Sequence, residues 1–282
     1  MQAFISVFLA VFQAIAAFIT GLFGTSSTPI TPISGKTTAS QSIVMKIGAI
    51  DKIRQFEGAC SDGEYVYQIM IEPSSSTGGD EKAVVLKIDP KTWTLAENGR
   101  SEMLTELNHA NDITYDPRIK LLMISNNAPN YTLVSALYPD SLQYKAGMTI
   151  EHPLYSLAYV DTGSTSYYYA GISGTYNFGE YNGAFDTIKT FKGIDNGYVK
   201  QSIETDNQYL YCLFSDSNCI YKYDFSGNYL GRCFLPNPES GLNSYEAEGI
   251  FFHGGKMYVS YNILGKNNGG VICKIDKIEF KK

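Results

Sequence analysis

Charged residues are scarce in this chain, and no run of basic residues occurs anywhere in it. Lys, Arg, Asp and Glu together make up 18% of the 282 residues, and the formal net charge is -6. Nucleic-acid binding needs clustered Lys and Arg side chains that neutralise phosphates. The sequence therefore argues against a nucleic-acid partner.

Several catalytic and metal-binding motifs are missing as well. The chain has no Gly-x-Ser-x-Gly elbow, no phosphate-binding loop and no His-Glu-x-x-His motif, which argues against the common hydrolase and nucleotide-binding classes. Its five cysteines show no Cys-x2-Cys spacing, so they match no common zinc motif. Cys219 and Cys233 flank a predicted turn at Phe225–Gly227, where they either form a disulfide or stay reduced and buried in strands.

Tyr, Gly and Phe are plentiful, with 22, 26 and 15 residues. A composition rich in aromatic residues and Gly but poor in charge favours β-sheets joined by many turns over helix bundles. Apolar residues make up 44% of the chain, enough to build a substantial core. The sequence predicts an all-β protein.

The N-terminus differs from the rest of the chain. Ala3–Phe23 is almost wholly apolar, close to the ~20 residues that cross a bilayer as a helix. It is predicted to be a hydrophobic helix, serving as a cleaved signal peptide, as a retained membrane anchor or as a soluble, self-associating helix. No Lys or Arg precedes the run and no clear Ala-x-Ala site follows it. Either of the first two interpretations exports the chain, so we expect an extracellular or cell-surface protein.

A repeat covers the remaining sequence. Five short segments, each followed by a polar turn and an apolar strand, align at Gly58–Asp62, Asp112–Asp116, Leu157–Asp161, Ser202–Asp206 and Gly249–His253. The turn positions are separated by 54, 45, 45 and 47 residues, and the longest interval contains the Ser/Gly-rich insert Pro73–Asp80. The strands expected after the turns are Tyr65–Ile71, Ile119–Ser125, Tyr167–Gly171, Tyr209–Phe214 and Lys256–Tyr261.

A third strand ending in Lys-apolar-Asp recurs at Lys87–Asp89, Lys222–Asp224 and Lys274–Asp276. Four short antiparallel strands per unit of ~45 residues are typical of a β-propeller blade. The sequence thus predicts a five-bladed β-propeller over residues 43–282, preceded by a signal peptide or anchor (1–24) and a Ser/Thr/Pro-rich linker (25–42). Because the last unit lacks a fourth strand, Ile43–Ile50 is expected to supply it and close the ring.

The repeats resemble those of exported bacterial propellers of the YVTN and NHL kind. Within that group, His109–Asp116 (His-Ala-Asn-Asp-Ile-Thr-Tyr-Asp) is similar to a motif of helveticin-like and teichoic-acid-protein-C-like propellers, with Ala110 where Gly is common. The resemblance implies an exported bacterial protein, and its helveticin-like part points to a structural or toxin-like module.

A polar residue precedes each repeat core and is expected to face the central channel. These residues are Glu57, Asn111, Ser156, Gln201 and Glu248. Carboxylate and amide oxygens at this density suit a hard cation, so Glu57, Asn111, Gln201 and Glu248 are candidate ligands for Ca2+. The alternative is a water-filled channel with a polar lining.

Histidines and carboxylates near the same mouth offer other chemistry. His109 is the candidate acid or base and a candidate ligand-binding residue, because histidine as a residue type changes its charge near neutral pH. His109, His152, Glu246 and Glu248 could hold a transition metal, while Asp112 is expected to face into its blade and bond backbone amides. His253 is expected at the opposite face.

Tyr176 and Tyr181 lie in a Gly- and Asn-containing segment, Tyr176–Gly183, predicted to be an exposed loop suited to sugar or peptide contact. The leading functional hypothesis is therefore a monomeric recognition module for a glycan, wall polymer or protein. It contacts the membrane only through the N-terminal segment. The alternative is a metal-dependent hydrolase or lyase with its site at the channel mouth.

Overall fold

The computed structural model describes residues 35–73, 81–127, 129–161, 166–195, 200–215, 218–239, 244–265 and 269–282. The apolar run Ala3–Phe23 and most of the predicted linker lie outside these ranges. Within them the chain forms strands and turns without a helix, so it contains no helix long and apolar enough to span a membrane.

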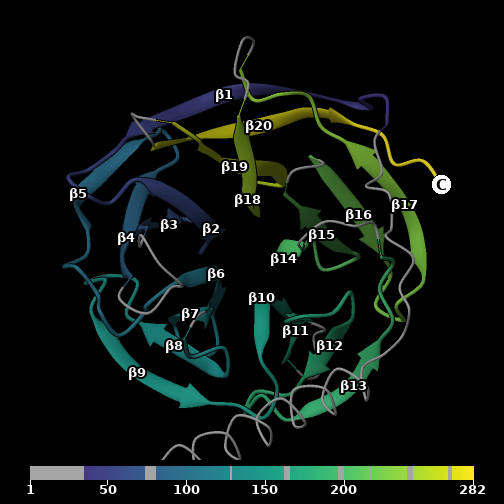
Figure 1. Cartoon of the computed structure of the whole chain (residues 1–282), viewed down its shortest axis with the longest axis horizontal. Coiled ribbons are helices and arrows are strands. Elements are labelled where there is room, and N and C mark those ends of the chain that lie inside the picture. Colours follow the sequence, from purple (N-terminus) through teal and green to yellow (C-terminus); the bar gives the residue numbers. More distant parts are fainter. Residues whose placement is uncertain are drawn as a thin grey trace, which may run out of the picture. The chain divides into compact units, whose positions relative to one another are not determined.

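Five four-stranded sheets are arranged in a ring around a common axis, which confirms the five-bladed propeller (Figure 1). Blade 1 contains β2 (Gln55–Ser61), β3 (Val66–Glu72), β4 (Lys82–Asp89) and β5 (Thr94–Arg100). Blade 2 contains β6 (Ala110–Asp116), β7 (Leu121–Asn126), β8 (Leu133–Leu137) and β9 (Tyr144–Thr149). Blade 3 contains β10 (Leu154–Asp161), β11 (Ser166–Ile172), β12 (Phe178–Tyr181) and β13 (Thr187–Phe191). Blade 4 contains β14 (Lys200–Thr205), β15 (Leu210–Phe214), β16 (Cys219–Tyr223) and β17 (Tyr229–Phe234). Blade 5 contains β18 (Tyr245–His253), β19 (Lys256–Ile263), β20 (Gly269–Ile278) and β1 (Ala39–Gly48).

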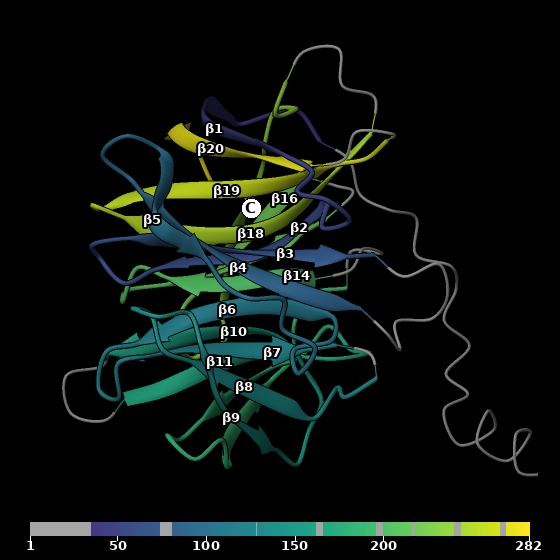
Figure 2. The same ribbon diagram turned by 90° about the vertical axis from the view of Figure 1, so that its left-hand side faces the viewer.

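The ring closes as the sequence predicts, because β1 pairs with β20 and becomes the outer strand of blade 5. The pairing runs antiparallel from Ala39 opposite Ile278 to Gly48 opposite Gly269. The strand begins at Ala39, four residues before the predicted start at Ile43. Figure 2 shows the blades from the side, with β1 lying against β20. The outer edge of β20 is thereby covered, which removes an exposed strand edge.

The hydrophobic core is divided among the blade interfaces. It forms five clusters of buried side chains, and each cluster takes residues from two neighbouring blades. One example is Tyr168 of blade 3, which packs beside Leu121 and Met123 of blade 2. Strands buried on both faces explain why β3, β7 and β15 are near-continuous apolar runs. Packing between blades therefore stabilises the ring.

A repeated Asp-x-x-Tyr-x-Tyr sequence builds the turn after the innermost strand in blades 1 and 4. Asp62 accepts hydrogen bonds from the amides of Glu64 and Tyr65 and from the Tyr67 hydroxyl, at 2.7–2.8 Å. Asp206 accepts the equivalent three bonds in blade 4, at 2.7–2.9 Å. These carboxylates are occupied in holding their own turns.

The five cysteines are free and buried. Cys219 and Cys233 lie on neighbouring strands but are not directly opposite each other. Cys219 lies opposite Phe234, and Cys233 lies opposite Ile220. The two thiols therefore face opposite sides of the sheet, one in the cluster with blade 3 and the other in the cluster with blade 5. Of the two sequence-based alternatives, the structure has the reduced, buried cysteines.

Candidate functional site

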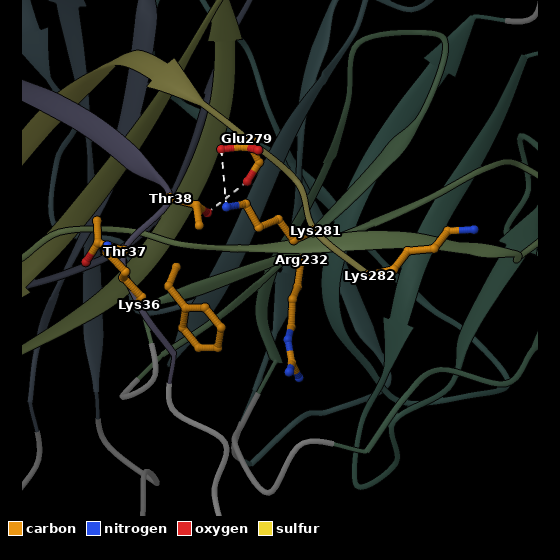
Figure 3. Close-up of a pocket in the computed structure, with 8 residues that line it drawn as sticks. Lys36, Thr37, Thr38, Arg232, Glu279, Lys281 and Lys282 are labelled. Carbon is orange, nitrogen blue, oxygen red and sulfur yellow. Dashed lines mark hydrogen bonds and ion pairs between the residues drawn. The ribbon is translucent and has the colours of Figure 1, made fainter.

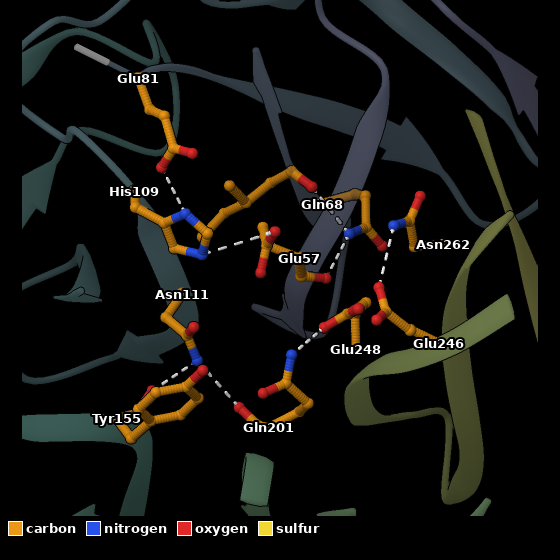
Figure 4. Close-up of polar contacts among 11 residues, drawn as sticks. Glu57, Gln68, Glu81, His109, Asn111, Tyr155, Gln201, Glu246, Glu248 and Asn262 are labelled. Carbon is orange, nitrogen blue, oxygen red and sulfur yellow. Dashed lines mark hydrogen bonds and ion pairs between the residues drawn. The ribbon is translucent and has the colours of Figure 1, made fainter. Parts of the chain in front are cut away.

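A β-bulge at the same place in each innermost strand builds one mouth of the central channel. The register slips at Phe56/Ala59, Ala110/Asp112, Leu154/Ser156, Lys200/Ser202 and Ala247/Gly249. A bulge leaves a residue outside the ladder and re-aims its side chain. The residues skipped include Glu57, Asn111, Gln201 and Glu248, whose side chains point toward one another in Figure 4.

Blade 3 departs from the expected ring by one residue. The residue skipped by its bulge is Tyr155, whereas Ser156 pairs with Gly171 inside the sheet. The Ser156 hydroxyl is buried above Gly171, where an added methyl group would meet it at 2.4 Å. Tyr155 instead lies among the mouth residues (Figure 4), and the nearby carboxylates of Glu57 and Glu248 add to burial in raising its pKa. Ser156 therefore does not take the ring position predicted for it.

His109 lies between two carboxylates at this mouth. Its Nδ1 contacts the Glu81 carboxylate, and its Nε2 is 3.8 Å from Glu57 Oε1. The first contact orients the imidazole, while the second is too long for a direct hydrogen bond. Both carboxylates are buried, whereas His109 keeps 23% of its side-chain surface exposed. A proton acceptor or donor is thus held at the opening of the channel.

Glu57 is a buried acid surrounded by other acids at this mouth. Burial raises its pKa well above the usual range, and the charges of Glu248, Glu246, Glu81 and Asp112 raise it further. The strongest charged influences on Glu57 are thus all carboxylates. We call the group of Glu57, Glu81, His109, Asn111, Tyr155, Gln201, Glu246 and Glu248 the carboxylate mouth. Its electrostatic potential favours positive charge.

The amide side chains of the carboxylate mouth donate through their NH2 groups and leave oxygens without partners. Asn111 donates to the carbonyl oxygens of Tyr155 (2.7 Å) and Gln201 (3.2 Å), and Gln201 donates to the Glu248 carboxylate. Buried amide oxygens of Asn111, Gln201, Gln68 and Asn262 have no hydrogen-bond partner. A buried acceptor without a donor is costly, by about 1–3 kcal/mol. The missing partner at this mouth is therefore a hydrogen-bond donor or a cation.

Asp112 forms the floor of the carboxylate mouth. Its carboxylate accepts bonds from the amides of Ile113 and Leu157 (both 3.0 Å) and Ile203 (3.2 Å), and from the Ser202 hydroxyl (3.0 Å). As expected, it bonds backbone amides. It faces blades 3 and 4 across the axis, however, and not the interior of its own blade. Burial raises the pKa of Asp112 well above its usual range, and these four hydrogen bonds oppose that shift.

Two glycines allow the innermost strands to approach one another closely, and one of them, Gly58, lies against Asp112. An added methyl group at Gly58 would lie 2.4 Å from Asp112 Oδ1 and 2.5 Å from Asp112 Cα. At Gly249 it would lie 2.6 Å from Ser260 Oγ and 2.7 Å from the amide of Ala59. The innermost strands are therefore packed so closely that the channel is closed at this level.

Of the residues proposed for a transition metal, His109, Glu246 and Glu248 belong to the carboxylate mouth, whereas His152 is paired elsewhere. His152 is paired with Glu151 at 3.8 Å and is half exposed, and His253 ends β18 and contacts the Ser61 hydroxyl at 2.9 Å. Among the described residues, no group of three or more His, Cys, Asp and Glu side chains is placed to hold a metal ion. Any metal at the carboxylate mouth would therefore depend on amide oxygens as well as carboxylates.

The Tyr176–Gly183 segment is not an exposed loop. Phe178–Tyr181 forms β12, with Tyr181 buried at 1% exposure in the core between blades 2 and 3. Tyr176 lies in the turn before this strand and is partly buried, which raises its pKa. The Asn and Gly residues favoured a loop, but Phe178 and Tyr181 enter the core on opposite faces of the strand, Phe178 toward blade 4 and Tyr181 toward blade 2. Tyr181 is therefore too deeply buried to contribute to the recognition surface predicted on this segment.

A hollow of about 300 Å3 lies at the rim, away from the channel (Figure 3). Lys36, Arg232, Lys281 and Lys282 line it together with Glu279. Lys281 pairs with Glu279 at 3.5 Å, and both side chains are 59% exposed. Exposed pairs of this kind contribute little to affinity or stability, so we place the candidate site at the channel.

The chain matches no known family model, and no curated protein sequence matches it. Solved structures do resemble it. A Myxococcus xanthus glutaminyl cyclase gives a TM-score of 0.57 at 11% identity, covering 86% of this chain and 100% of the cyclase. A luciferin-regenerating enzyme gives 0.49 at 13% identity, with coverages of 84% and 97%. Virginiamycin B lyase from Staphylococcus aureus gives 0.43 at 12% identity, with coverages of 84% and 89%. At these identities the cyclase supports the propeller fold alone.

Proposed function

We propose that this protein is an exported recognition module whose carboxylate mouth binds a primary ammonium group on its ligand. The proposal rests on the buried amide oxygens near Glu57 and Glu248, such as those of Asn111 and Gln201, which accept no hydrogen bond within the protein. An ammonium group offers three N–H donors and a positive charge. It would satisfy amide oxygens such as that of Asn111 while offsetting the mutual repulsion of the carboxylates.

The ligand class follows from this chemistry. A protein terminus, a lysine side chain, an amino sugar or an amine-bearing wall polymer all present a primary ammonium group. The surface location and the bacterial source rest on the apolar run Ala3–Phe23 and on the resemblance to exported propellers. We further propose that the protein acts as a monomer, without nucleic acid, and touches the membrane only through its N-terminal segment.

Ca2+ is the competing occupant of the same mouth. Glu57, Glu248, Asn111 and Gln201 would supply carboxylate and amide oxygens, the ligands that Ca2+ prefers. Both amides would bind through Asn111 Oδ1 and Gln201 Oε1, which accept no hydrogen bond within the protein, because their NH2 groups are the donors. Ca2+ takes six to eight oxygens, and these four side chains reach six only if each carboxylate binds through both of its oxygens. An ammonium group needs three acceptors, so it makes the smaller demand on the mouth.

The test is titration calorimetry of the full chain with glycinamide and with N-acetylglycinamide, which lacks the ammonium charge. We expect glycinamide to bind and the acetylated compound not to bind. Glu248→Gln should weaken glycinamide binding about tenfold or more, since charge-assisted hydrogen bonds are worth about 1.5–3 kcal/mol. The matched control is Asp276→Asn on an exposed rim strand, which should leave binding unchanged. Equal binding of the two compounds, or none of either, would leave the mouth as a water-filled channel. Loss of glycinamide binding in added Ca2+ would favour the metal.

The Glu81–His109–Glu57 arrangement favours a second candidate function, a hydrolase or lyase acting at the same mouth. Glu81 holds Nδ1, so Nε2 is directed toward Glu57 and can accept or donate a proton there. In the metal-dependent form of this alternative, Glu57, Asn111, Gln201 and Glu248 are the ligands.

The name of the glutaminyl cyclase makes a glutaminyl peptide the first substrate to assay. His109→Gln should abolish turnover while glycinamide still binds. Absence of turnover in the unaltered protein would leave the recognition function alone.

A further inference from the structure

The channel has a second opening, where the innermost strands end. It is a cavity of about 500 Å3 to which all five blades contribute. Tyr115 of β6, Tyr159 of β10 and Phe252 of β18 supply aromatic rings, and Glu204 of β14 supplies a carboxylate. We call this cavity the aromatic mouth. Its volume lies within the range of cavities that hold small molecules.

The aromatic mouth is separate from the carboxylate mouth. Asp112 and its bonds to Leu157 and Ile203 close the axis between them, and Gly58 and Gly249 pack against that level without side chains. A ligand in one mouth therefore does not reach the other through the channel. A ligand in this cavity would therefore be distinct from any ligand of the carboxylate mouth.

Glu204 is the acid beside the aromatic rings, and Asp161 also lines the cavity. Burial raises the pKa of Glu204 well above its usual range, and a bound cation would lower it again by favouring the charged carboxylate. Glu204 Oε1 accepts a bond from the amide of Thr205 at 2.8 Å, and the Glu204 side chain is partly exposed and lines the cavity. Asp62 and Asp206 also line the cavity, but their oxygens already accept three bonds each from their own turns. Their negative charges remain and add to that of Glu204. Among the described lining residues there is no Lys or Arg.

The aromatic rings distinguish this cavity from a simple acidic cluster. Tyr115 and Phe252 are partly exposed and come from blades 2 and 5, on different sides of the axis. One side of the Tyr159 ring already faces Arg118, at 5.7 Å from the ring centroid, and Arg118 is itself paired with Asp116. A ligand in the cavity would therefore contact mainly the rings of Tyr115 and Phe252. Aromatic faces beside a carboxylate bind methylated ammonium groups, whose charge is spread over methyl groups and is weakly hydrated.

We propose that the aromatic mouth binds a compact quaternary ammonium compound of about the size of choline, with Glu204 opposite its charge and the rings of Tyr115 and Phe252 against its methyl groups. A neutral sugar is the main alternative, because aromatic rings also stack on sugar rings. A sugar could donate hydroxyl hydrogen bonds to a carboxylate such as Glu204, but it would leave the negative charges of Glu204, Asp62 and Asp206 unbalanced in a cavity whose described lining has no Lys or Arg. Charge complementarity therefore favours the cation.

The test compares choline with 3,3-dimethyl-1-butanol, which has the same shape without the charge, by titration calorimetry of the full chain. We expect saturable binding of choline and at least tenfold weaker binding of the neutral compound, a difference within the range of cation–π and ionic contacts. Glu204→Gln keeps the shape of the side chain and should weaken choline binding about tenfold. Phe252→Leu keeps an apolar contact and should also weaken it.

Glu57→Gln in the carboxylate mouth is the matched control and should leave choline binding unchanged. It also separates this inference from the proposed function, because that change should affect glycinamide and not choline. Equal binding of choline and 3,3-dimethyl-1-butanol, or no binding of either, would overturn the inference. Binding of glucose or N-acetylglucosamine without choline would identify a sugar site and would overturn it as well.

Discussion

Replacing Asp112 tests whether the axis is held together by a single carboxylate. In Asp112→Ala, the buried amides of Ile113, Leu157 and Ile203 lose the carboxylate that accepts their hydrogen bonds. Each buried amide left without a partner costs about 1–3 kcal/mol, so we expect a loss of about 3–9 kcal/mol of unfolding free energy. This is a large part of the ~5–15 kcal/mol that folds a typical domain.

Asp112→Asn should cost less than Asp112→Ala. The asparagine oxygen can still accept from Leu157 and Ile203, and its NH2 group can donate to the Ser202 hydroxyl. It cannot accept the bond from the Ile113 amide at the same time. Losing one neutral hydrogen bond predicts a cost of about 1 kcal/mol, and removing the buried charge offsets part of it.

Urea unfolding measures these differences. The chain has a single tryptophan, Trp93, whose ring lies 5.0 Å from that of Tyr258 across the interface of blades 1 and 5. Its fluorescence reports on the ring, and circular dichroism reports on the sheets in the same samples. Asp276→Asn, at an exposed position, is the control. If Asp112→Ala unfolds at the same urea concentration as the unaltered protein, Asp112 does not hold the blades together.

Three further predictions concern other parts of the structure. Gly58→Ala places a methyl group 2.4 Å from Asp112 Oδ1 and should cost about 1–3 kcal/mol in urea unfolding through overpacking; an unchanged midpoint would show that the axis can widen. The raised pKa of Glu57 means that the folded state binds the proton of this carboxyl more tightly than the unfolded state does. The resulting contribution to the free energy of unfolding is fully present in acid, below the unfolded pKa of about 4.3. That contribution is lost as pH rises through the folded pKa. Glu57→Gln should therefore stabilise the protein more at pH 8 than at pH 4, and the opposite trend would contradict the assignment. The five free, buried cysteines should resist a thiol reagent in the folded protein and all react in urea without reductant; fewer than five reactive thiols in urea would reveal a disulfide.

The repeats allowed the fold to be predicted, because blade strands are buried and leave a strong pattern. The expected strand Lys256–Tyr261 corresponds to β19 (Lys256–Ile263), and the closing strand pairs with the last blade. Each unit repeats the same contacts with its neighbours, so one error in a boundary does not change the number of blades. Local sequence was sufficient for this part.

The site was harder to predict because it depends on bulges and on long-range contacts. Glu57, Asn111, Gln201 and Glu248 were found because they precede the repeat cores, but the bulge in blade 3 selects Tyr155 in place of Ser156. A slip of one residue reverses the face of a side chain, and no residue type in that segment signals it. Glu81 was missed since it follows the blade 1 insert and only the folded ring brings it to His109. In the Tyr181 segment, turn-forming residues concealed a short strand.

The pairing of β1 with β20 has a consequence for the order in which the protein folds. Blades 1 to 4 are each made of four consecutive strands, so each can form as soon as its own stretch of chain is available. Blade 5 joins residues as far apart as Thr38 and Glu279, 241 positions along the chain. Such a contact carries a larger loop-closure entropy and forms late. During synthesis β1 must therefore stay without its partner strand until Gly269–Ile278 has emerged. A nascent chain halted before Gly269 would carry four complete blades and an exposed edge on β19, which would be a target for chaperones and proteases.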